Sequence, residues 1–207
     1  SDRGIKAGTY LIPKNASWNA ILASLRGGGA VSAVLVPEGF TVTQIEALIA
    51  AKLAASPDSV AAAVRDTSLI RRLDVPTSTL EGYLFPSTYN VARKTSAPQF
   101  VLMMVGKFKK ELTPELRDAA AARGLSVRQL VTLASIVEKE TGRADERRLV
   151  ASVYANRLRI GMGLQCDPTV IYALAAEGKY SGNLRRDDLE FDSPYNTYRY
   201  RGLPPGP

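Results

Sequence analysis

The residues best placed for acid–base chemistry lie in the segment 126–142. At 3.6 residues per turn, the segment predicts a helix with one wide apolar stripe. Glu140 lies four residues beyond Ile136 and seven beyond Leu133, so it projects within this stripe. Lys139 points to the opposite side. A carboxyl group held against hydrocarbon has its protonated form favoured, which suits a general acid near neutral pH.

A purely structural Glu140 is the alternative, because carboxylates near a helix end commonly cap the helix or form ion pairs. Arg143 and Arg147 follow within the next turns and are within reach of such a pair. The apolar stripe argues for a functional role, since burying an unpaired charge is costly. Glu138 has a similar position at a more exposed angle, so it is the weaker catalytic candidate.

The composition excludes several catalytic mechanisms. The chain has no histidine, which removes Ser-His-Asp and Cys-His catalysis and most zinc sites. Cys166 is the one cysteine, so it forms no disulfide within the chain, and we assign it no role. The sequence contains neither a Walker loop nor a dinucleotide-binding glycine motif after a predicted strand. Catalysis would therefore use carboxylates, hydroxyls, amides or lysines, and we expect neither a cofactor nor a metal site.

The net charge of +7 favours polyanionic surroundings such as nucleic acid, anionic lipid or an acidic cell-wall polymer. The basic residues are scattered among acidic ones rather than gathered in a stripe with aromatics, which argues against nucleic acid. The sequence has no window of about 18 or more apolar residues, which a membrane-spanning helix would need. The chain opens on a strand-like segment without a signal peptide and stops within Gly-Leu-Pro-Pro-Gly-Pro, so we expect sequence beyond both ends. A membrane anchor before the first residue is compatible with this.

Hydrophobic periodicity and turn residues divide the chain near Pro76. The earlier part predicts strands at 8–12 and 33–36 and helices at 17–25, 41–53 and within 57–73. The later part predicts helices at 98–112, 114–123, 126–142, 144–160 and 167–177, with loop and strand at 80–89 and from 192 onward. In the 144–160 helix, the residues expected to face inward are Leu149, Val150, Val153 and Leu158. We expect an α+β fold, with a small strand–helix unit over 1–75 and a mainly helical domain with a few strands over 76–207.

Further polar and aromatic side chains could contact a ligand. Glu146 and Asn156 lie on the 144–160 helix, and the Asn156 amide, expected partly inside a helix pair, must find partners in a ligand or in the backbone. Gln165 and Asp167 lie just before the next helix, where Asp167 followed by proline is typical of an N-cap. Aromatic rings beside amides suit stacking on sugar rings, and equally the packing face of a small sheet. Such groups are Tyr195, Asn196 and Tyr198 in the tail, and Tyr83, Phe85 and Tyr89.

Several long motifs carry a resemblance that spans essentially the whole chain. The central one is Leu-Ala-Ser-Ile-Val-Glu-Lys-Glu-Thr at 133–141, and the others lie at 6–10, 36–39, 80–86, 146–147, 150–162, 164–172, 195–198 and 202–206. In this order they resemble the endolytic murein transglycosylase family, also called YceG-like. The resemblance implies a bitopic protein of the bacterial inner membrane. Its periplasmic part would combine a LysM-like subdomain, here 1–75, with a catalytic domain, here 76–207 and incomplete at its C-terminal end.

The resemblance also implies an activity. Such enzymes cleave the MurNAc–GlcNAc β-1,4 bond within nascent glycan strands and leave a 1,6-anhydro-MurNAc end, which terminates strand elongation. The family's catalytic glutamate precedes threonine in Glu-Lys-Glu-Thr, which here is Glu140, in agreement with the helix argument. Peptidoglycan is then the substrate, and peptidoglycan synthases are candidate partners. Candidates for substrate contact or for support of Glu140 are Glu138, Glu146, Asn156, Gln165, Asp167, Tyr195, Asn196 and Tyr198.

Two alternatives stay open. A non-catalytic peptidoglycan-binding module would bind the same polymer without turnover. A hydrolase would release a free reducing end and would need a second carboxylate near the bond, for which Glu146 is the candidate.

Overall fold

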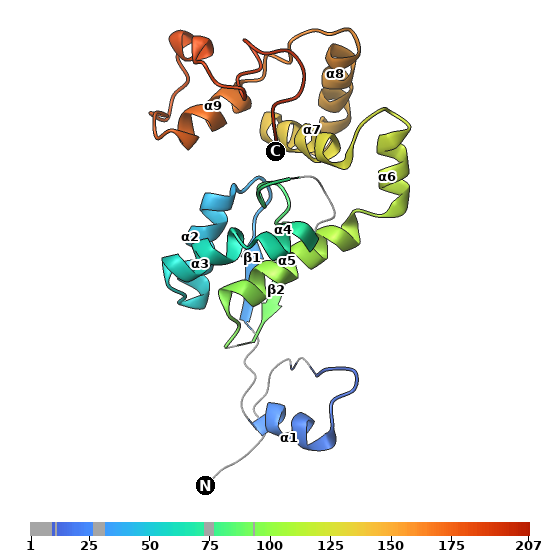
Figure 1. Cartoon of the computed structure of the whole chain (residues 1–207), viewed down its shortest axis with the longest axis vertical. Coiled ribbons are helices and arrows are strands. Elements are labelled where there is room, and N and C mark those ends of the chain that lie inside the picture. The colour runs from blue at the N-terminus through green and yellow to red at the C-terminus, as the bar shows by residue number, and fades with distance from the viewer. Residues whose placement is uncertain (1–9, 11, 27–31, 73–76, 93) are drawn as a thin grey trace. The chain divides into compact units, whose positions relative to one another are not determined.

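The computed structural model describes residues 10, 12–26, 32–72, 77–92 and 94–207. Its elements, in chain order, are α1 (Trp18–Arg26), β1 (Ser32–Val36), α2 (Val42–Leu53), α3 (Pro57–Val64), α4 (Thr67–Arg72), β2 (Ser87–Val91), α5 (Ala97–Glu111), α6 (Pro114–Ala121), α7 (Val127–Glu140), α8 (Arg147–Arg159), α9 (Asp167–Ala176) and the 3-10 helix η1 (Arg186–Glu190) (Figure 1). The fold is α+β, as expected. The predicted strand at 8–12 lies largely outside the described residues.

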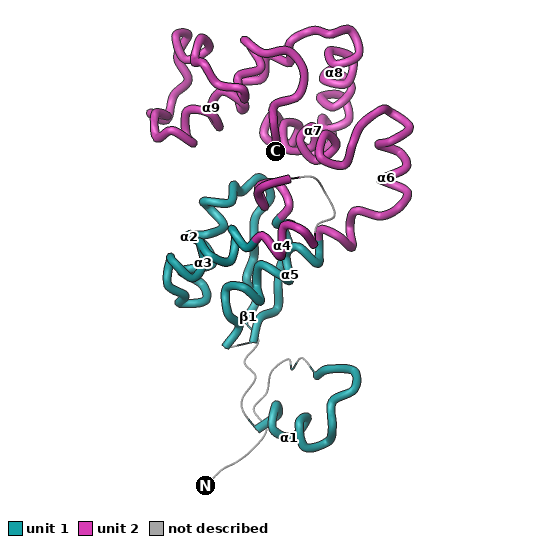
Figure 2. The backbone as a smooth tube through the Cα atoms, viewed as in Figure 1, with its two compact units in different colours: residues 1–66, 84–107 teal, residues 67–83, 108–207 magenta. Residues whose placement is uncertain are grey.

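The chain forms two compact units (Figure 2). The first consists of residues 1–66 and 84–107, and the second of residues 67–83 and 108–207. The units therefore alternate along the sequence. The division into a LysM-like part over 1–75 and a catalytic part over 76–207 stays a prediction.

The first unit is built on an antiparallel pair of strands. Ser32 of β1 lies opposite Val91 of β2, and Val36 lies opposite Ser87. Alternate side chains are buried on one face of each strand, as the period of two requires. They are Val34 and Val36 of β1 and Tyr89 and Val91 of β2.

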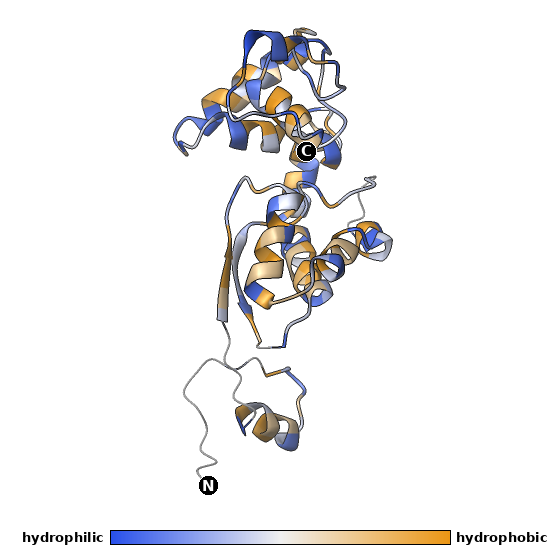
Figure 3. Cartoon of the chain, turned by 90° about the vertical axis from the view of Figure 1, so that its left-hand side faces the viewer, coloured by the Kyte–Doolittle hydropathy of each residue, from blue (hydrophilic) through white to orange (hydrophobic). Residues whose placement is uncertain are grey.

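Helices bury their apolar sides in the same unit. The α2 helix begins with a capping box, in which the Thr41 hydroxyl accepts from the Gln44 amide, and it buries Ile45 and Ile49 one turn apart. The Phe100 ring of α5 is fully buried and meets Tyr89 edge-to-face, with the ring centroids 5.3 Å apart. Figure 3 shows hydrophobic and hydrophilic residues interspersed along the helices, as expected of amphipathic elements.

The second unit is organised around α7, which contacts α6, α8 and α9. A capping box fixes where α7 begins: the Ser126 amide donates to Gln129 Oε1 over 2.8 Å, and the Gln129 amide donates to Ser126 Oγ over 3.2 Å. The C-terminal half of α7 packs into a buried cluster formed with α8 and with the segment before α9. Its members are Ile136, Val137, Tyr154, Leu164 and Cys166.

Three sequence predictions about this unit are wrong. The predicted 144–160 helix begins only at Arg147, and it turns Val150 and Tyr154 toward the core. Leu149 and Val153 are consequently rotated outward and are 67% and 41% exposed, although both were expected to face inward. From residue 192 to 207 the chain forms turns, with no strand in this fully described stretch.

Candidate active site

Glu140 is the last residue of α7, and the next residue, Thr141, is already extended at φ −139° and ψ 129°. Because the helix ends here, no further turn covers the side chain, and Glu140 is exposed. The predicted shelter between Leu133 and Ile136 is therefore wrong. The carboxylate stands at the edge of the apolar stripe, with Ile136 buried one turn before it.

Two buried polar groups lie next to the Glu140 carboxylate. The Cys166 thiol donates to Glu140 Oε2 over 3.3 Å. The Tyr154 side chain of α8 belongs to the same buried cluster as Cys166, and it lines the same hollow as Glu140. Tyr154 and Cys166 are only 4% and 1% exposed. Sequence reasoning missed both residues, although Tyr154 carries a hydroxyl on the inward stripe of its helix, four residues from both Val150 and Leu158.

Burial keeps both groups protonated. It raises the pKa of Cys166 to about 12, and the nearby Glu140 charge adds to the effect. Burial is also the largest cause of the raised pKa of Tyr154, with further contributions from Cys166 and Glu140. At neutral pH the thiol and the phenol therefore both carry a proton that can be donated, and the thiol donates its proton to the Glu140 carboxylate.

A hollow of about 270 Å³ opens in front of the same carboxylate. Its lining is half aliphatic and half polar, and consists of Glu140, Leu149, Val150, Val153, Tyr154, Arg157 and Gln165. Glu140 is the one carboxylate in that lining. A larger hollow of about 350 Å³, between Leu125 and Pro205, contains no acidic residue in its lining, so it offers no acid or base of this kind.

Polar residues of the hollow are held by the local backbone. The Arg157 guanidinium donates to the Leu164 carbonyl, which anchors α8 to the segment that follows it. Gln165 has a positive φ of 50°, a conformation that is uncommon for a residue with a side chain. Its backbone amide donates to the Thr197 carbonyl over 3.2 Å. Of the residues predicted to support Glu140, Gln165 alone shares the lining of this hollow.

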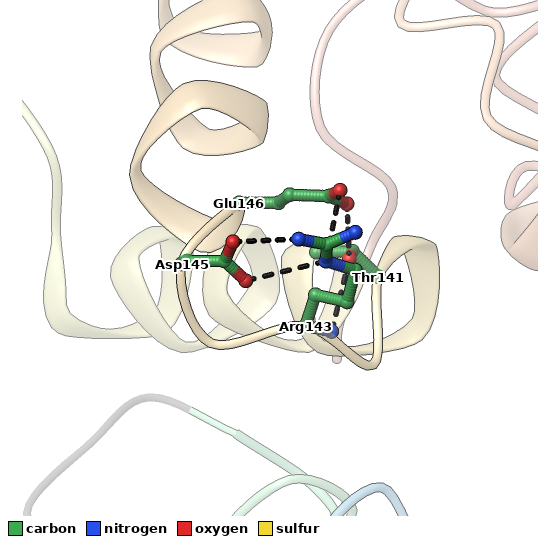
Figure 4. Close-up of polar contacts among 4 residues, drawn as sticks. All are labelled: Thr141, Arg143, Asp145 and Glu146. Carbon is green, nitrogen blue, oxygen red and sulfur yellow. Dashed lines mark hydrogen bonds and ion pairs between the residues drawn. The ribbon is translucent and has the colours of Figure 1, made fainter.

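Glu146 belongs to the turn that joins α7 to α8 (Figure 4). It accepts a 3.0 Å hydrogen bond from Thr141 Oγ1 through Oε2, and its Oε1 lies 3.1 Å from Arg143 Nε. Arg143 also forms an ion pair with Asp145 over 2.8 Å. Glu138 in turn lies 3.1 Å from Arg147. The two arginines considered as partners of Glu140 thus bind other carboxylates.

The tail residues have mainly structural contacts. Asn196 is fully buried and donates to the carbonyls of Leu189 and Phe191 over 2.8 and 2.7 Å. Its Oδ1 accepts from the Tyr198 amide over 3.0 Å. Tyr195 packs on Tyr172, with ring centroids 4.9 Å apart. The side chain of Asn196 thus stabilises the turns of its own segment, which explains why the segment contains no strand.

Asp167 and Asn156 differ from their predicted roles. The N-cap residue of α9 is Cys166, and it makes no side-chain cap bond, whereas Asp167 lies in the first turn. The Asp167 carboxylate instead accepts a 2.6 Å hydrogen bond from the Tyr198 hydroxyl. Asn156 is exposed rather than enclosed by a helix pair, and it does not belong to the lining of the hollow.

The site contains one carboxylate, Glu140, in the lining of an open hollow, with two buried polar side chains next to it. This is the arrangement of a one-carboxylate acid–base site. In the described part of the chain, no cluster of acidic or sulfur side chains is arranged to hold a metal ion. The chain belongs to the YceG-like family, whose model matches residues 1–207.

Named relatives and a solved structure agree with this family. The chain is 36% identical over 220 residues to the endolytic murein transglycosylase of Bacillus subtilis (strain 168), covering 99% of this chain and 60% of the relative. It is 33% identical over 235 residues to that of Streptococcus pneumoniae serotype 2 (strain D39 / NCTC 7466), covering 98% and 42%. The crystal structure of the yceG-like protein lmo1499 from Listeria monocytogenes matches with a TM-score of 0.76 and 34% identity, over 98% of this chain and 71% of that one. The chain thus spans only part of the length of these relatives.

Proposed function

We propose that this protein is a peptidoglycan lytic transglycosylase that cleaves MurNAc–GlcNAc β-1,4 bonds inside glycan strands and leaves 1,6-anhydro-MurNAc ends. The observation that carries the proposal is the Glu140 carboxylate, which lines the hollow without a second carboxylate. The names of the relatives support the same reaction and the same polymer. The net charge of +7 suits an anionic polymer as substrate.

In the proposed mechanism, Glu140 is the catalytic residue. Its carboxyl group gives a proton to the glycosidic oxygen while the bond from that oxygen to C1 of the muramyl residue breaks. The resulting carboxylate then takes the proton of the C6 hydroxyl of the same sugar as that oxygen bonds to C1. The proton returns to Glu140, and no water is consumed. Because the nucleophile is part of the substrate, its effective concentration is high and one carboxylate suffices.

The neighbouring acids give no support to hydrolysis. A hydrolytic site needs a second carboxylate about 5 to 9.5 Å from the first, facing the same bond. Glu146 is engaged by Thr141 and Arg143, and Glu138 is engaged by Arg147. Neither belongs to the lining of the hollow.

The test is digestion of purified sacculi by the full-length protein, with the released ends identified by mass spectrometry. Glu140→Gln keeps the shape of the side chain and removes the transferable proton. We expect the release of anhydro ends to fall by about 100-fold or more. The matched control is Glu177→Gln, which removes a carboxylate paired with Lys179 and absent from the lining of the hollow, and should leave the release unchanged.

Each other outcome identifies an alternative. Near-normal release by Glu140→Gln would remove Glu140 from the mechanism. Free reducing ends in place of anhydro ends would identify a hydrolase. Binding to sacculi without any new ends from the wild-type protein would identify a non-catalytic binding module.

We further propose that the protein works on the periplasmic side of the bacterial inner membrane. There a LysM-like part over residues 1–75 would bind glycan, and peptidoglycan synthases would be partners. The family resemblance supports these assignments. No helix among the described residues is both long and apolar enough to cross a bilayer. Fractionation of cells that produce the full-length protein tests the location, and recovery outside the membrane fraction would contradict it.

A further inference from the structure

Hydrogen bonds to both the backbone amide and the backbone carbonyl of Cys166 fix its position. Its amide donates to Thr197 Oγ1 over 3.0 Å, and its carbonyl accepts from Thr169 Oγ1 over 2.7 Å. The two threonine hydroxyls lie 2.9 Å apart and are themselves buried. The thiol that meets Glu140 is therefore presented by a rigid support.

The position of Tyr154 is fixed by packing. It belongs to the buried cluster that includes Ile136 and Val137 of α7, so its ring is held against the helix that ends at Glu140. Tyr154 and Glu140 both contribute to the lining of the hollow, whereas Cys166 does not.

We propose that Tyr154 and Cys166 are positioning residues, which hold the Glu140 carboxylate in one orientation at the hollow. The proposal rests on the proposed function, because that function makes Glu140 the acid and base. An exposed glutamate at a helix end has many rotamers open to it. Catalysis requires one orientation, and displacements of about 1 Å are costly. The two donors supply the orientation that the helix end does not.

Removing the polar group of either residue should leave the Glu140 carboxylate less well oriented. The other titratable and charged groups near Glu140 are unchanged in such variants. They are Arg157 in the lining of the hollow, Tyr198, and Asp167, which binds Tyr198.

Three variants separate hydrogen bonding from packing. Tyr154→Phe removes the phenol hydroxyl and keeps the ring. Cys166→Val and Cys166→Thr add the same branched shape in the same buried place, but only threonine keeps a donor. Thermal unfolding of each variant establishes that it is folded before the other measurements are interpreted.

The kinetic measurement uses soluble, uncrosslinked glycan strands. We expect kcat to fall about tenfold in Tyr154→Phe and in Cys166→Val, with KM within about twofold of the wild type. Cys166→Thr should recover most of the lost kcat.

Carbon NMR at one fixed pH tests the inference without turnover. The side-chain carboxyl resonance of Glu140, assigned by its loss in Glu140→Gln, should move in Tyr154→Phe and Cys166→Val relative to the wild type. Unchanged kcat and an unchanged resonance in both folded variants would overturn the inference. So would identical behaviour of Cys166→Val and Cys166→Thr, which would assign the effect to packing. If the wild type releases no anhydro ends, the proposed function fails, and the resonance still decides this inference.

Discussion

The Tyr198 hydroxyl donates a 2.6 Å hydrogen bond to Oδ1 of Asp167, joining the C-terminal segment to the first turn of α9. This hydrogen bond is the largest cause of the raised pKa of Tyr198, which reaches about 12. The negative charge of Glu140 is one of the smaller causes of the same rise in the pKa of Tyr198. The contact therefore links the tail of the chain to the surroundings of the proposed acid.

Tyr198→Phe should lower the free energy of unfolding by about 1 kcal/mol at neutral pH, a value reduced by partial exposure of the pair. The pKa of Tyr198 is raised from 10.0 to about 12 in the folded protein, so the unfolded chain releases this proton first as the pH rises. The stabilisation is complete below pH 10 and is lost between pH 10 and about 12. Urea unfolding of both proteins at about pH 8 and about pH 11 measures the difference. An equal difference at the two pH values would contradict the assignment.

Asn196→Ala should destabilise the fold by about 2 kcal/mol, because the half-buried carbonyls of Leu189 and Phe191 lose their donors. Asn156→Ala is the matched control, since that amide is exposed, and should change stability by less than about 0.5 kcal/mol. Chemical denaturation of the two variants measures both values. Similar stabilities for the two would refute the structural role of Asn196.

Glu146→Ala should loosen the turn after Glu140 by removing the acceptor of the Thr141 hydroxyl and the partner of Arg143. We expect a loss of about 1 kcal/mol in unfolding free energy, since the ion pair is half exposed. A several-fold lower release of anhydro ends should accompany it. Glu146→Gln keeps an oxygen for Thr141 and should retain most of the activity. If both variants lose activity completely, Glu146 takes part in the chemistry itself.

Gln165→Ala tests whether this side chain contacts the glycan. Because the side chain is exposed in the lining of the hollow, stability should change by less than about 0.5 kcal/mol. A lost hydrogen bond to substrate should lower kcat/KM about three- to tenfold. Kinetics on soluble glycan strands measure this, with Asn183→Ala as a control in an exposed loop outside that lining. Unchanged kcat/KM in Gln165→Ala would remove it from the binding site.

The helices were predictable because their signals are local. The 98–112 prediction matches α5 within one residue at each end, and Phe100 and Met104 of this helix are buried. β1 was also predicted, but its partner β2 lies beyond the expected division near Pro76. The residue pattern within β1 or within β2 does not indicate which distant strand will be its partner. The outward rotation of Leu149 and Val153 depends on which side of α8 meets α7, which the pattern of α8 alone does not specify.

The sequence predicted one residue of the candidate site, Glu140, but not the side chains that surround it. Glu140 follows from the helical stripe, but its exposure follows from where α7 ends. Cys166 lies 26 residues further along the chain and reaches Glu140 only because the segment before α9 packs on α7. A cysteine between a glutamine and an aspartate carries no sign of such a contact. Asn196 looks like a ligand-binding amide in the sequence, whereas its partners are carbonyls of its own turns.

The pairing of β1 with β2 also constrains how the chain is made. β1 has left the ribosome long before Val91, which completes β2, is synthesised. Until then β1 has no partner in the sheet, and the backbone edge that will meet β2 is open to pairing with other chains. A polypeptide interrupted between the two strands would retain that open edge and should aggregate or be degraded. In the two-stranded sheet that the structure describes, β2 closes this edge of β1.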